Sequence, residues 1–281
     1  MVINKEKAGK PIIGVSLFRS TEGDAVLAHL KPFSNIQWLD LSGSKVTDAG
    51  LIHLKGLTSL QVLQLQATKI TDAGCVHLKG LSKLQRLNLA GTALTDSGLK
   101  QLKALTMLKS LDLGGTKVTD AGLTHLKTCA NLLELDIQAT KVTGTGLAHL
   151  KGLSKLQWMD ASFTDFSDAG LDELMRFTKM KTLYLFDTKI TDAGLARLKG
   201  LTKLKRLRLA SKNVSDNGLG YLTDLAELRM LDLYGTKVTD AGLTVLKNLT
   251  KLEELDLRFT KVTAAGVKKL EAALPKCKIV R

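Results

Sequence analysis

LRMLDLYGTKVTDAGLTVLKNLTK, residues 228–251, decides the fold, because near-copies of it follow one another along most of the chain. Ten copies of 24 residues run from Ile36 to Pro275 without insertion or deletion, and a degenerate copy precedes them at residues 12–35. A fixed period of this length predicts a solenoid, in which each turn covers the apolar face of its neighbour.

Each copy divides into a strand part and a helix part. In the quoted copy, Leu231 and Leu233 (places 4 and 6, counting its first residue as place 1) alternate with polar neighbours, which predicts a short half-buried strand. Thr239 then precedes Asp-Ala-Gly-Leu, a helix start at which the threonine hydroxyl caps a free backbone N–H. Leu243 and Leu246 lie three residues apart, so they share the buried face of that helix.

Place 15 is glycine in all ten copies, from Gly50 to Gly266. A glycine inside a helix costs about 1 kcal/mol relative to alanine, so its repetition predicts a geometric need. Either a close approach of the neighbouring turn or a special backbone angle would create that need.

The consensus LxxLxLxxTKVTDAGLxxLKxLxx resembles a leucine-rich repeat, in a 24-residue form with threonine at place 9 where many members carry asparagine or cysteine. Its TDAGL corner is most similar to bacterial repeat proteins of the kind abundant in planctomycetes. The resemblance implies an α/β solenoid of eleven turns, a right-handed arc with a concave parallel β-sheet and short helices on the convex side. It implies little about function, because the family binds unrelated ligands and most members have no catalytic site.

The unbroken register predicts one domain over residues 12–281. Within it, residues 12–35 form a degenerate N-terminal cap turn, residues 36–275 the ten repeats, and residues 276–281 a C-terminal cap strand. Residues 1–11 are polar and basic, which predicts a short disordered lead and not a signal peptide. A cytoplasmic location follows as an expectation, with a fragment of a secreted or larger protein left open.

Cys75 and Cys129 replace leucines at core places. They are more than one turn apart, and successive strands lie about 4.8 Å from each other, so a disulfide between them is out of reach. We therefore expect both to be buried free thiols.

The formal net charge of +14 raises the question of nucleic-acid binding. Many lysines are set by the repeat, at place 10 (Lys237 in the quoted copy) and place 20 (Lys247), where they decorate the corner and the helix end. Solvation is the favoured interpretation, and binding of a polyanion along these lysine rows is the alternative. The five histidines all occupy place 18, and helices stack roughly 10 Å apart, too far for two imidazoles to share a metal ion.

Places 2, 3, 5, 7 and 8 form what we call the strand face, the side of the sheet away from the helices. These places do not follow the repeat, and in a solenoid such a variable surface is the usual binding face. Acidic and basic residues nearly balance on it, which disfavours nucleic acid there. Asp112, Asp136 and Asp160 form an acidic stripe at place 5 that either belongs to the repeat itself or meets a basic partner.

Aromatic residues gather on the same face: eight of the twelve in the chain lie at its places, six of them in repeats 6–10. Exposed aromatic residues together with arginine are typical of interface hot spots. The residues predicted to bind a partner are Trp158, Phe163, Tyr184, Phe186, Arg206, Arg208, Tyr234, Phe259, Asp136 and Asp160.

Motifs of catalysis are missing from the sequence: it contains no GxSxG, no phosphate-binding glycine loop, no HExxH and no close-spaced cysteine pairs. We therefore predict a non-catalytic scaffold that binds a protein or peptide on the concave strand face, with no cofactor and no metal. Nucleic acid is disfavoured as a partner, no membrane association is expected, and the chain is expected to be a monomer. A structural spacer within a larger protein is a third hypothesis.

Overall fold

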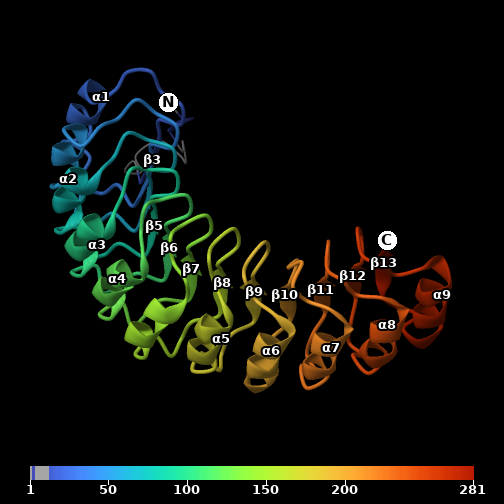
Figure 1. Cartoon of the computed structure of the whole chain (residues 1–281). Helices are drawn as coiled ribbons and strands as arrows, with labels where there is room; N and C mark the ends of the chain where they lie inside the picture. The colour runs from blue at the N-terminus through green and yellow to red at the C-terminus, as the bar shows by residue number, and fades with distance from the viewer. Residues whose placement is uncertain (1, 4–12) are drawn as a thin grey trace. The chain divides into compact units, whose positions relative to one another are not determined.

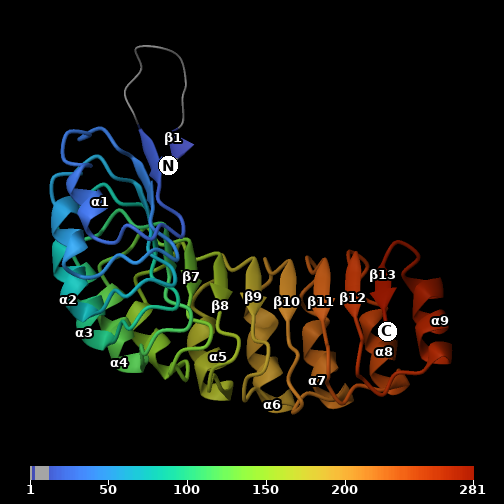
Figure 2. The same cartoon turned by 90° about the horizontal axis from the view of Figure 1, so that it is seen from above.

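The computed structural model describes residues 2–3 and 13–281, and they fall into two compact units. Unit 1 contains the residues up to Thr140 together with His149–Leu153, and unit 2 contains Lys141–Ala148 and Ser154–Arg281. Within each unit, strands lie side by side and short helices cover one side of them (Figures 1 and 2). The single domain expected over residues 12–281 stays a prediction.

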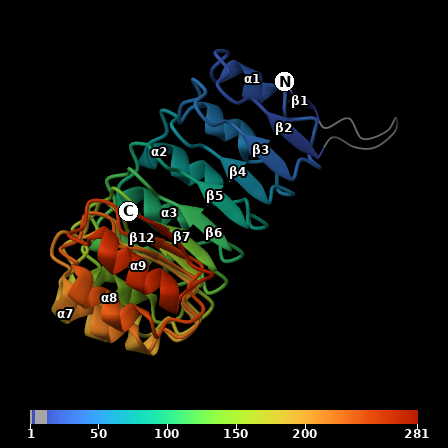
Figure 3. The ribbon, with the colours of Figure 1, turned by 90° about the vertical axis from the view of Figure 1, so that its right-hand side faces the viewer.

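The strands of unit 1 lie next to one another in chain order (Figure 3). They are β1 (Val2–Ile3), β2 (Gly14–Ser16), β3 (Trp38–Asp40), β4 (Val62–Gln64), β5 (Arg86–Asn88), β6 (Ser110–Asp112) and β7 (Glu134–Asp136). Its helices, with η denoting 3-10 helices, are α1 (Ala25–Ala28), η1 (Gly50–Leu54), α2 (Asp72–Cys75), η2 (Val76–Leu78), α3 (Asp96–Leu102), α4 (Asp120–Leu123) and η3 (Thr124–Leu126). β1 pairs antiparallel with β2, whereas β2 to β7 pair in parallel.

Unit 2 has the same layout, with a row of strands backed by helices (Figure 2). The strands, each parallel to its neighbours, are β8 (Trp158–Asp160), β9 (Thr182–Tyr184), β10 (Arg206–Arg208), β11 (Met230–Asp232), β12 (Glu254–Asp256) and β13 (Lys278–Val280). The helices are α5 (Asp168–Leu174), α6 (Asp192–Leu195), η5 (Ala196–Gly200), α7 (Asp216–Leu219), η6 (Gly220–Leu222), α8 (Asp240–Leu246) and α9 (Ala264–Ala273), and η4 (Thr145–Leu150) precedes β8 in the chain.

The chain ends contain two strands outside the repeats. The sequence predicts a disordered lead over residues 1–11; of these the structure describes Val2–Ile3, which form β1, and the others lie outside the described residues. β13 lies within the segment 276–281 that is predicted to form a cap strand.

Strand pairing joins residues that are 24 apart, so each turn stacks in register on the next. Leu207 lies opposite Leu183 on one side and Leu231 on the other, and all three are buried. The leucines of the helix side, such as Leu195 and Leu219, are fully buried as well. The predicted α/β solenoid of parallel strands and short helices is thus confirmed in each unit.

Two threonines hold the loop of each regular turn. Thr236, at place 9, is buried, and its hydroxyl donates to the carbonyl of Leu233 at 2.7 Å. Thr239, at place 12, accepts the N–H of Ala241 at 3.2 Å and so caps α8. The predicted capping role of this threonine is confirmed.

A ladder of aspartates joins the helix starts of successive turns. Asp216, at place 13, accepts the N–H of Thr239 in the next turn at 2.8 Å and its hydroxyl at 2.6 Å. The same pair of bonds links Asp24 to Thr47, Asp48 to Thr71, Asp72 to Thr95, Asp96 to Thr119, Asp168 to Thr191, Asp192 to Ser215 and Asp240 to Thr263. Each of these helix starts therefore depends on a carboxylate from the turn before it.

This ladder explains the glycine at place 15. A Cβ atom built on Gly242 would lie 2.3 Å from Oδ1 of Asp216, and one built on Gly194 would lie 2.1 Å from Oδ1 of Asp168. Real Cβ atoms do not approach so closely, so any larger residue would push the carboxylate off its threonine. Of the two explanations that the sequence offers, close approach of a neighbouring turn is the correct one.

The ladder changes at the start of unit 2, where Gly144 stands at place 13 in place of aspartate. There the N–H of Ser167 donates to the carbonyl of Thr143 at 3.2 Å. The ring of Phe166 packs into the freed space: it would lie 2.7 Å from a Cβ built on Gly144 or on Gly170. Two glycines thus make room for the largest side chain of the interior, which is fully buried.

The interior of unit 1 contains two cysteines at leucine places of the repeat. Cys75 and Cys129 are free and fully buried, as the repeat predicts, and burial raises the pKa of the Cys75 thiol to about 12. Among the described residues, no helix is both long and apolar enough to cross a membrane.

Candidate functional site

Nine of the ten residues predicted to bind a partner belong to unit 2, and Asp136 belongs to unit 1. The strand register arranges those of unit 2 in rows. Trp158 and Arg206 lie on either side of Thr182 at place 3, and Tyr184 lies between Asp160 and Arg208 at place 5. The remaining four are at the carboxyl ends of the strands: Phe186 and Tyr234 at place 7, and Phe163 and Phe259 at place 8.

Six of these side chains form what we call the aromatic patch: Trp158, Phe163, Tyr184, Phe186, Tyr234 and Phe259. The Phe186 ring lies 5.0 Å from that of Phe163 and 5.9 Å from that of Tyr234, which in turn lies 4.8 Å from that of Phe259. Trp158 meets Tyr184 edge to face at 5.9 Å. Phe186 and Tyr234 meet although one turn separates them, because that turn carries only Ala210 at place 7.

Arg208 connects the two parts of the aromatic patch. Its guanidinium carbon lies 5.4 Å from the ring centre of Tyr184 and 5.8 Å from that of Phe186. Its Nε donates to Oδ2 of Asp232 at 3.0 Å, and Asp232 is only 7% exposed. A cation stacked on rings and fixed by a nearly buried carboxylate is held in one orientation.

A second arginine repeats this arrangement further along the sheet. Arg258 lies over Tyr234 at 5.6 Å and is hydrogen-bonded to Asp256. Burial alone would raise the pKa of the Asp256 carboxyl, but the hydrogen bonds and the positive charge of Arg258 outweigh it and hold that pKa below its usual range. The pair is therefore ionised at neutral pH.

Phe163 and Phe259 have a backbone conformation that phenylalanine rarely adopts. Their φ angles are +57° and +59°, in the left-handed region, and their side chains are 54% and 77% exposed. At the same place other turns carry glycine or alanine, for example Gly115 and Ala139, which also have positive φ. Ala67, Ala139 and Asp187 hold this conformation without a ring, so the fold needs the backbone angle at place 8 but not an aromatic side chain.

The aspartates at place 5 have a role within their own turns. Oδ1 of Asp160 accepts the N–H of Ser162 at 2.8 Å, and Oδ1 of Asp136 accepts the N–H of Gln138 at 2.9 Å. The same bond holds the ends of β6, β11 and β12. The acidic stripe is therefore explained by the repeat itself, and a role of Asp136 and Asp160 in binding stays a prediction.

Arg206 lies apart from the aromatic patch, at the amino end of β10. Its side chain is exposed and has no ion pair within the described parts of the chain. Four lysines lie close to it, two just before Arg206 in the chain and two just before Thr182, its partner on β9. We call these five residues the cationic edge: Lys179, Lys181, Lys203, Lys205 and Arg206.

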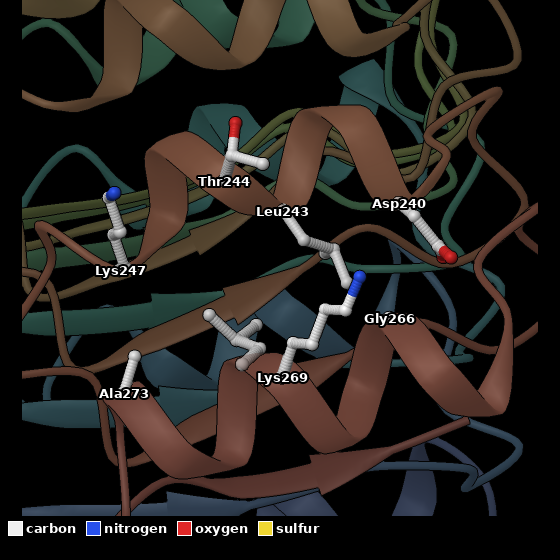
Figure 4. A pocket seen from close by; sticks show the side chains of 8 residues that line it. Asp240, Leu243, Thr244, Lys247, Gly266, Lys269 and Ala273 are labelled. Carbon is white, nitrogen blue, oxygen red and sulfur yellow. The ribbon is translucent and has the colours of Figure 1, made fainter.

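Two hollows are present in unit 2. The first lies on the strand face beside the aromatic patch, has a volume of about 280 Å³, and has Met230 in its lining and Arg208 and Arg258 at its rim. The second, of about 210 Å³, lies between α8 and α9 (Figure 4), where Leu243 and Leu270 are nearly buried and Lys269 reaches across the gap. Only the first adjoins predicted binding residues.

The sequence predicts the patch residues but not how they are held. It gives no sign that Arg258 pairs with Asp256 beside Tyr234. The left-handed backbone at place 8 was also not predicted, although the recurrence of glycine there, as in Gly43, Gly91 and Gly115, is a signal for positive φ. No group of three or more histidine, cysteine, aspartate or glutamate side chains within residues 2–3 and 13–281 is arranged to hold a metal ion.

Comparison with known proteins gives a consistent result for the fold. Models of the leucine-rich repeat match residues 34–94 and, in a second form, residues 104–126, 178–199 and 248–270. No curated protein sequence matches the chain.

Solved structures of bacterial repeat proteins are similar to it. An internalin (inlF) from Listeria monocytogenes has 23% identity and a TM-score of 0.62, with 89% of this chain and 81% of that chain covered. Internalin C2 from the same species has 25% identity and a TM-score of 0.58, covering 81% and 80%. A leucine-rich repeat protein of Leptospira interrogans has 16% identity and a TM-score of 0.53, covering 90% and 80%.

These similarities agree with the stacked strands and the buried leucines. Proteins of this family are generally non-catalytic scaffolds, and their repeats are often used to bind other proteins. The chain is a leucine-rich repeat protein.

Proposed function

We propose that the chain binds a protein or peptide ligand on the strand face of unit 2, centred on the aromatic patch and Arg208. The rings would supply the buried apolar contact area, and Arg208 would contribute a cation already held in place. This combination is the usual composition of an interface hot spot.

The observation that carries this proposal is the exposure of two rings of the aromatic patch. Phe163 and Phe259 leave most of their apolar surface in water. Ala67, Ala139 and Asp187 hold the same left-handed backbone at this place, so the fold needs the backbone angle there but no ring. Clustered aromatic side chains that the fold does not need are characteristic of binding surfaces.

Two other functions stay as hypotheses. Binding of a polyanion would use the lysine rows at places 10 and 20, and a structural spacer would need no ligand on the strand face. A monomeric state and a cytoplasmic location stay predictions.

The test is a nuclease-treated pull-down from a lysate of the source organism at moderate salt. The wild-type chain is compared with a patch variant, Trp158→Ala/Tyr184→Ala/Phe186→Ala/Arg208→Ala. A control variant, Trp38→Ala/Gln64→Ala/Gln66→Ala/Arg86→Ala, removes four residues from the strand face of unit 1, at places 3, 5, 7 and 3 of their copies. Circular dichroism establishes that all three chains are folded.

A protein retained by the wild-type chain and the control variant but lost by the patch variant supports the proposal. Equal retention by all three chains, or capture of nucleic acid alone before nuclease treatment, contradicts it. The second result would favour the lysine rows as the binding surface. Salt also distinguishes the two kinds of binding, because phosphate binding weakens steeply between ~50 and 200 mM salt whereas binding to an aromatic interface changes little.

A further inference from the structure

The cationic edge brings five positive charges together at the amino ends of β9 and β10. The backbone N–H of Lys205 donates to the carbonyl of Lys181 at 2.8 Å, and that of Arg206 donates to the same carbonyl at 3.0 Å. Lys179 lies two residues before Lys181, and Lys203 lies two residues before Lys205. All five side chains are exposed.

The other arginines on the strand face of unit 2 are paired within the chain. Arg208 is paired with Asp232, Arg229 with Glu253, and Arg258 with Asp256. The five residues of the cationic edge have no such carboxylate partner among the residues that the structure describes. Like charges on neighbouring strands repel each other, so the edge gains stability when a negative group is brought to it.

The cationic edge adjoins the aromatic patch directly. Trp158 lies in the same row as Arg206, with Thr182 between them, and Tyr184 follows two residues after Thr182 along β9. Four residues of strand separate place 3 from place 7, a distance of roughly 13 Å. A short peptide segment can therefore reach the cations and the rings at once.

Resting on the proposed function, we infer that the ligand is an acidic peptide segment. Its aspartate or glutamate side chains would lie against the cationic edge, and its apolar side chains would cover the aromatic patch. The carboxylates complement a cluster of five cations that have no ion pair among the described residues, and the apolar side chains remove the rings from water. The cationic edge alone would not distinguish such a ligand from a general polyanion. The aromatic patch alone would not distinguish it from a general apolar surface.

A nucleic acid fits the same surface less well. Its phosphates would follow the cationic edge, but beyond it the arginines are already paired with Asp232 and Asp256, whose negative charges repel a phosphate backbone. The acidic peptide needs positive charge only where the chain provides it.

The experiment selects short random peptides displayed on phage against the folded full chain, and counter-selects against the patch variant. The most enriched peptide is then synthesised, and its affinity is measured by fluorescence anisotropy. An edge variant, Lys181→Glu/Lys205→Glu/Arg206→Glu, is compared with a control variant of equal charge change, Lys199→Glu/Lys237→Glu/Lys261→Glu, whose lysines lie at the repeat's own lysine places.

We expect the enriched peptides to combine acidic residues with aromatic or aliphatic ones. The edge variant should bind the synthetic peptide at least about 30-fold more weakly than the wild-type chain, and the control variant should stay within about threefold, because only nearby charges act at physiological salt.

Other results would overturn the inference in distinguishable ways. Patch-dependent peptides that are neutral or basic would exclude an acidic ligand and leave the proposed function standing. If the patch variant binds acidic peptides as tightly as the wild-type chain does, the cationic edge is a general polyanion-binding surface that acts without the aromatic patch. If no patch-dependent peptide is enriched, an acidic peptide is excluded, and the pull-down then decides separately on protein binding.

Discussion

The strand faces of the two units differ although the turns beneath them are the same. At places 7 and 8 of β4 to β7, unit 1 carries small or polar residues: Gln66, Ala67, Ala90, Gly91, Gly114, Gly115, Gln138 and Ala139. Unit 2 carries Phe163, Phe186, Tyr234, Arg258 and Phe259 among the corresponding residues. Both rows of strands keep the 24-residue register and the aspartate ladder.

The comparison shows that the fold does not require the aromatic patch. Strands β4 to β7 of unit 1 keep the same buried leucines with glutamine, alanine and glycine at the places where unit 2 has rings. The two faces therefore differ in the surface that they expose and not in the packing beneath it. The comparison also defines the residues that would convert one face into the other.

The largest expected effect concerns the interior beneath the patch, where unit 2 departs from the repeat. Replacing Phe166 by alanine removes a fully buried ring packed against Gly144 and Gly170, and should lower the free energy of unfolding by about 3–5 kcal/mol. The control is Val118→Ala, at the same place in unit 1, which removes fewer buried atoms and should cost less. Urea unfolding monitored by circular dichroism measures both; equal losses would mean that the turn is not specially packed.

The next effect separates binding from stability. In the double variant Phe163→Ala/Phe259→Ala, each ring is replaced by the residue that Ala67 and Ala139 provide in unit 1 with the same positive φ. We expect the affinity for a peptide selected on the wild-type chain to fall at least about 30-fold, as for hot-spot residues. The free energy of unfolding should fall by no more than about 2 kcal/mol, because alanine keeps the same left-handed backbone and only the contacts of two largely exposed rings are lost. A large loss of stability with unchanged affinity would give the rings a structural role.

The reverse exchange tests the strain directly in unit 1. Gly115 has a φ of +67°, and a Cβ there would meet no atom closer than 3.7 Å, so Gly115→Phe adds a ring without a clash. Its cost should be about 1–2 kcal/mol, from the left-handed backbone alone. Lys117→Phe adds the same ring at an exposed corner residue without positive φ, and should change the melting temperature less. Equal effects of the two variants would contradict the strain argument.

The smallest effect is a dependence on pH. Arg258 holds the pKa of Asp256 below its usual range against the effect of burial, and the bonds from Thr263 lower that of Asp240. Because both pKa values are lower in the folded chain, their stabilisation is complete above the unfolded pKa of about 4 and is lost as the pH falls through the folded values. The melting temperature should therefore decline below about pH 4. Replacing Asp256 by asparagine removes one of these carboxyl groups and should make the decline of the melting temperature shallower. The control, Asp224→Asn, changes an exposed aspartate outside the strands and should have the smaller effect.

Most of the fold could be predicted from the sequence because the repeat is regular. Alternation at Leu231 and Leu233 identifies the strand, Thr239 identifies the helix start, and the invariant glycine indicates close approach. A constant spacing of 24 residues also determines which side chains become neighbours on the sheet, so the aromatic patch could be found by register alone.

What the sequence did not predict depends on geometry between turns. The bond from Thr239 to Asp216 joins residues 23 apart, and only the stacking angle brings them together. The contact of Phe186 with Tyr234 depends on the size of Ala210, and the exposure of Phe259 depends on a backbone angle. The division of the described residues into two units follows no interruption of the register.

The aspartate ladder makes whole turns interchangeable parts. Every link from a place-13 aspartate to the threonine or serine of the next turn spans 23 residues, so an in-frame duplication or deletion of one 24-residue segment among turns that carry this aspartate restores each link with a new neighbour. A shift of even one residue would break a link and expose buried leucines. Chains of this kind can therefore gain or lose length in units of a full turn while keeping their interior, and the strand face can be lengthened, shortened or recombined independently of the packing beneath it.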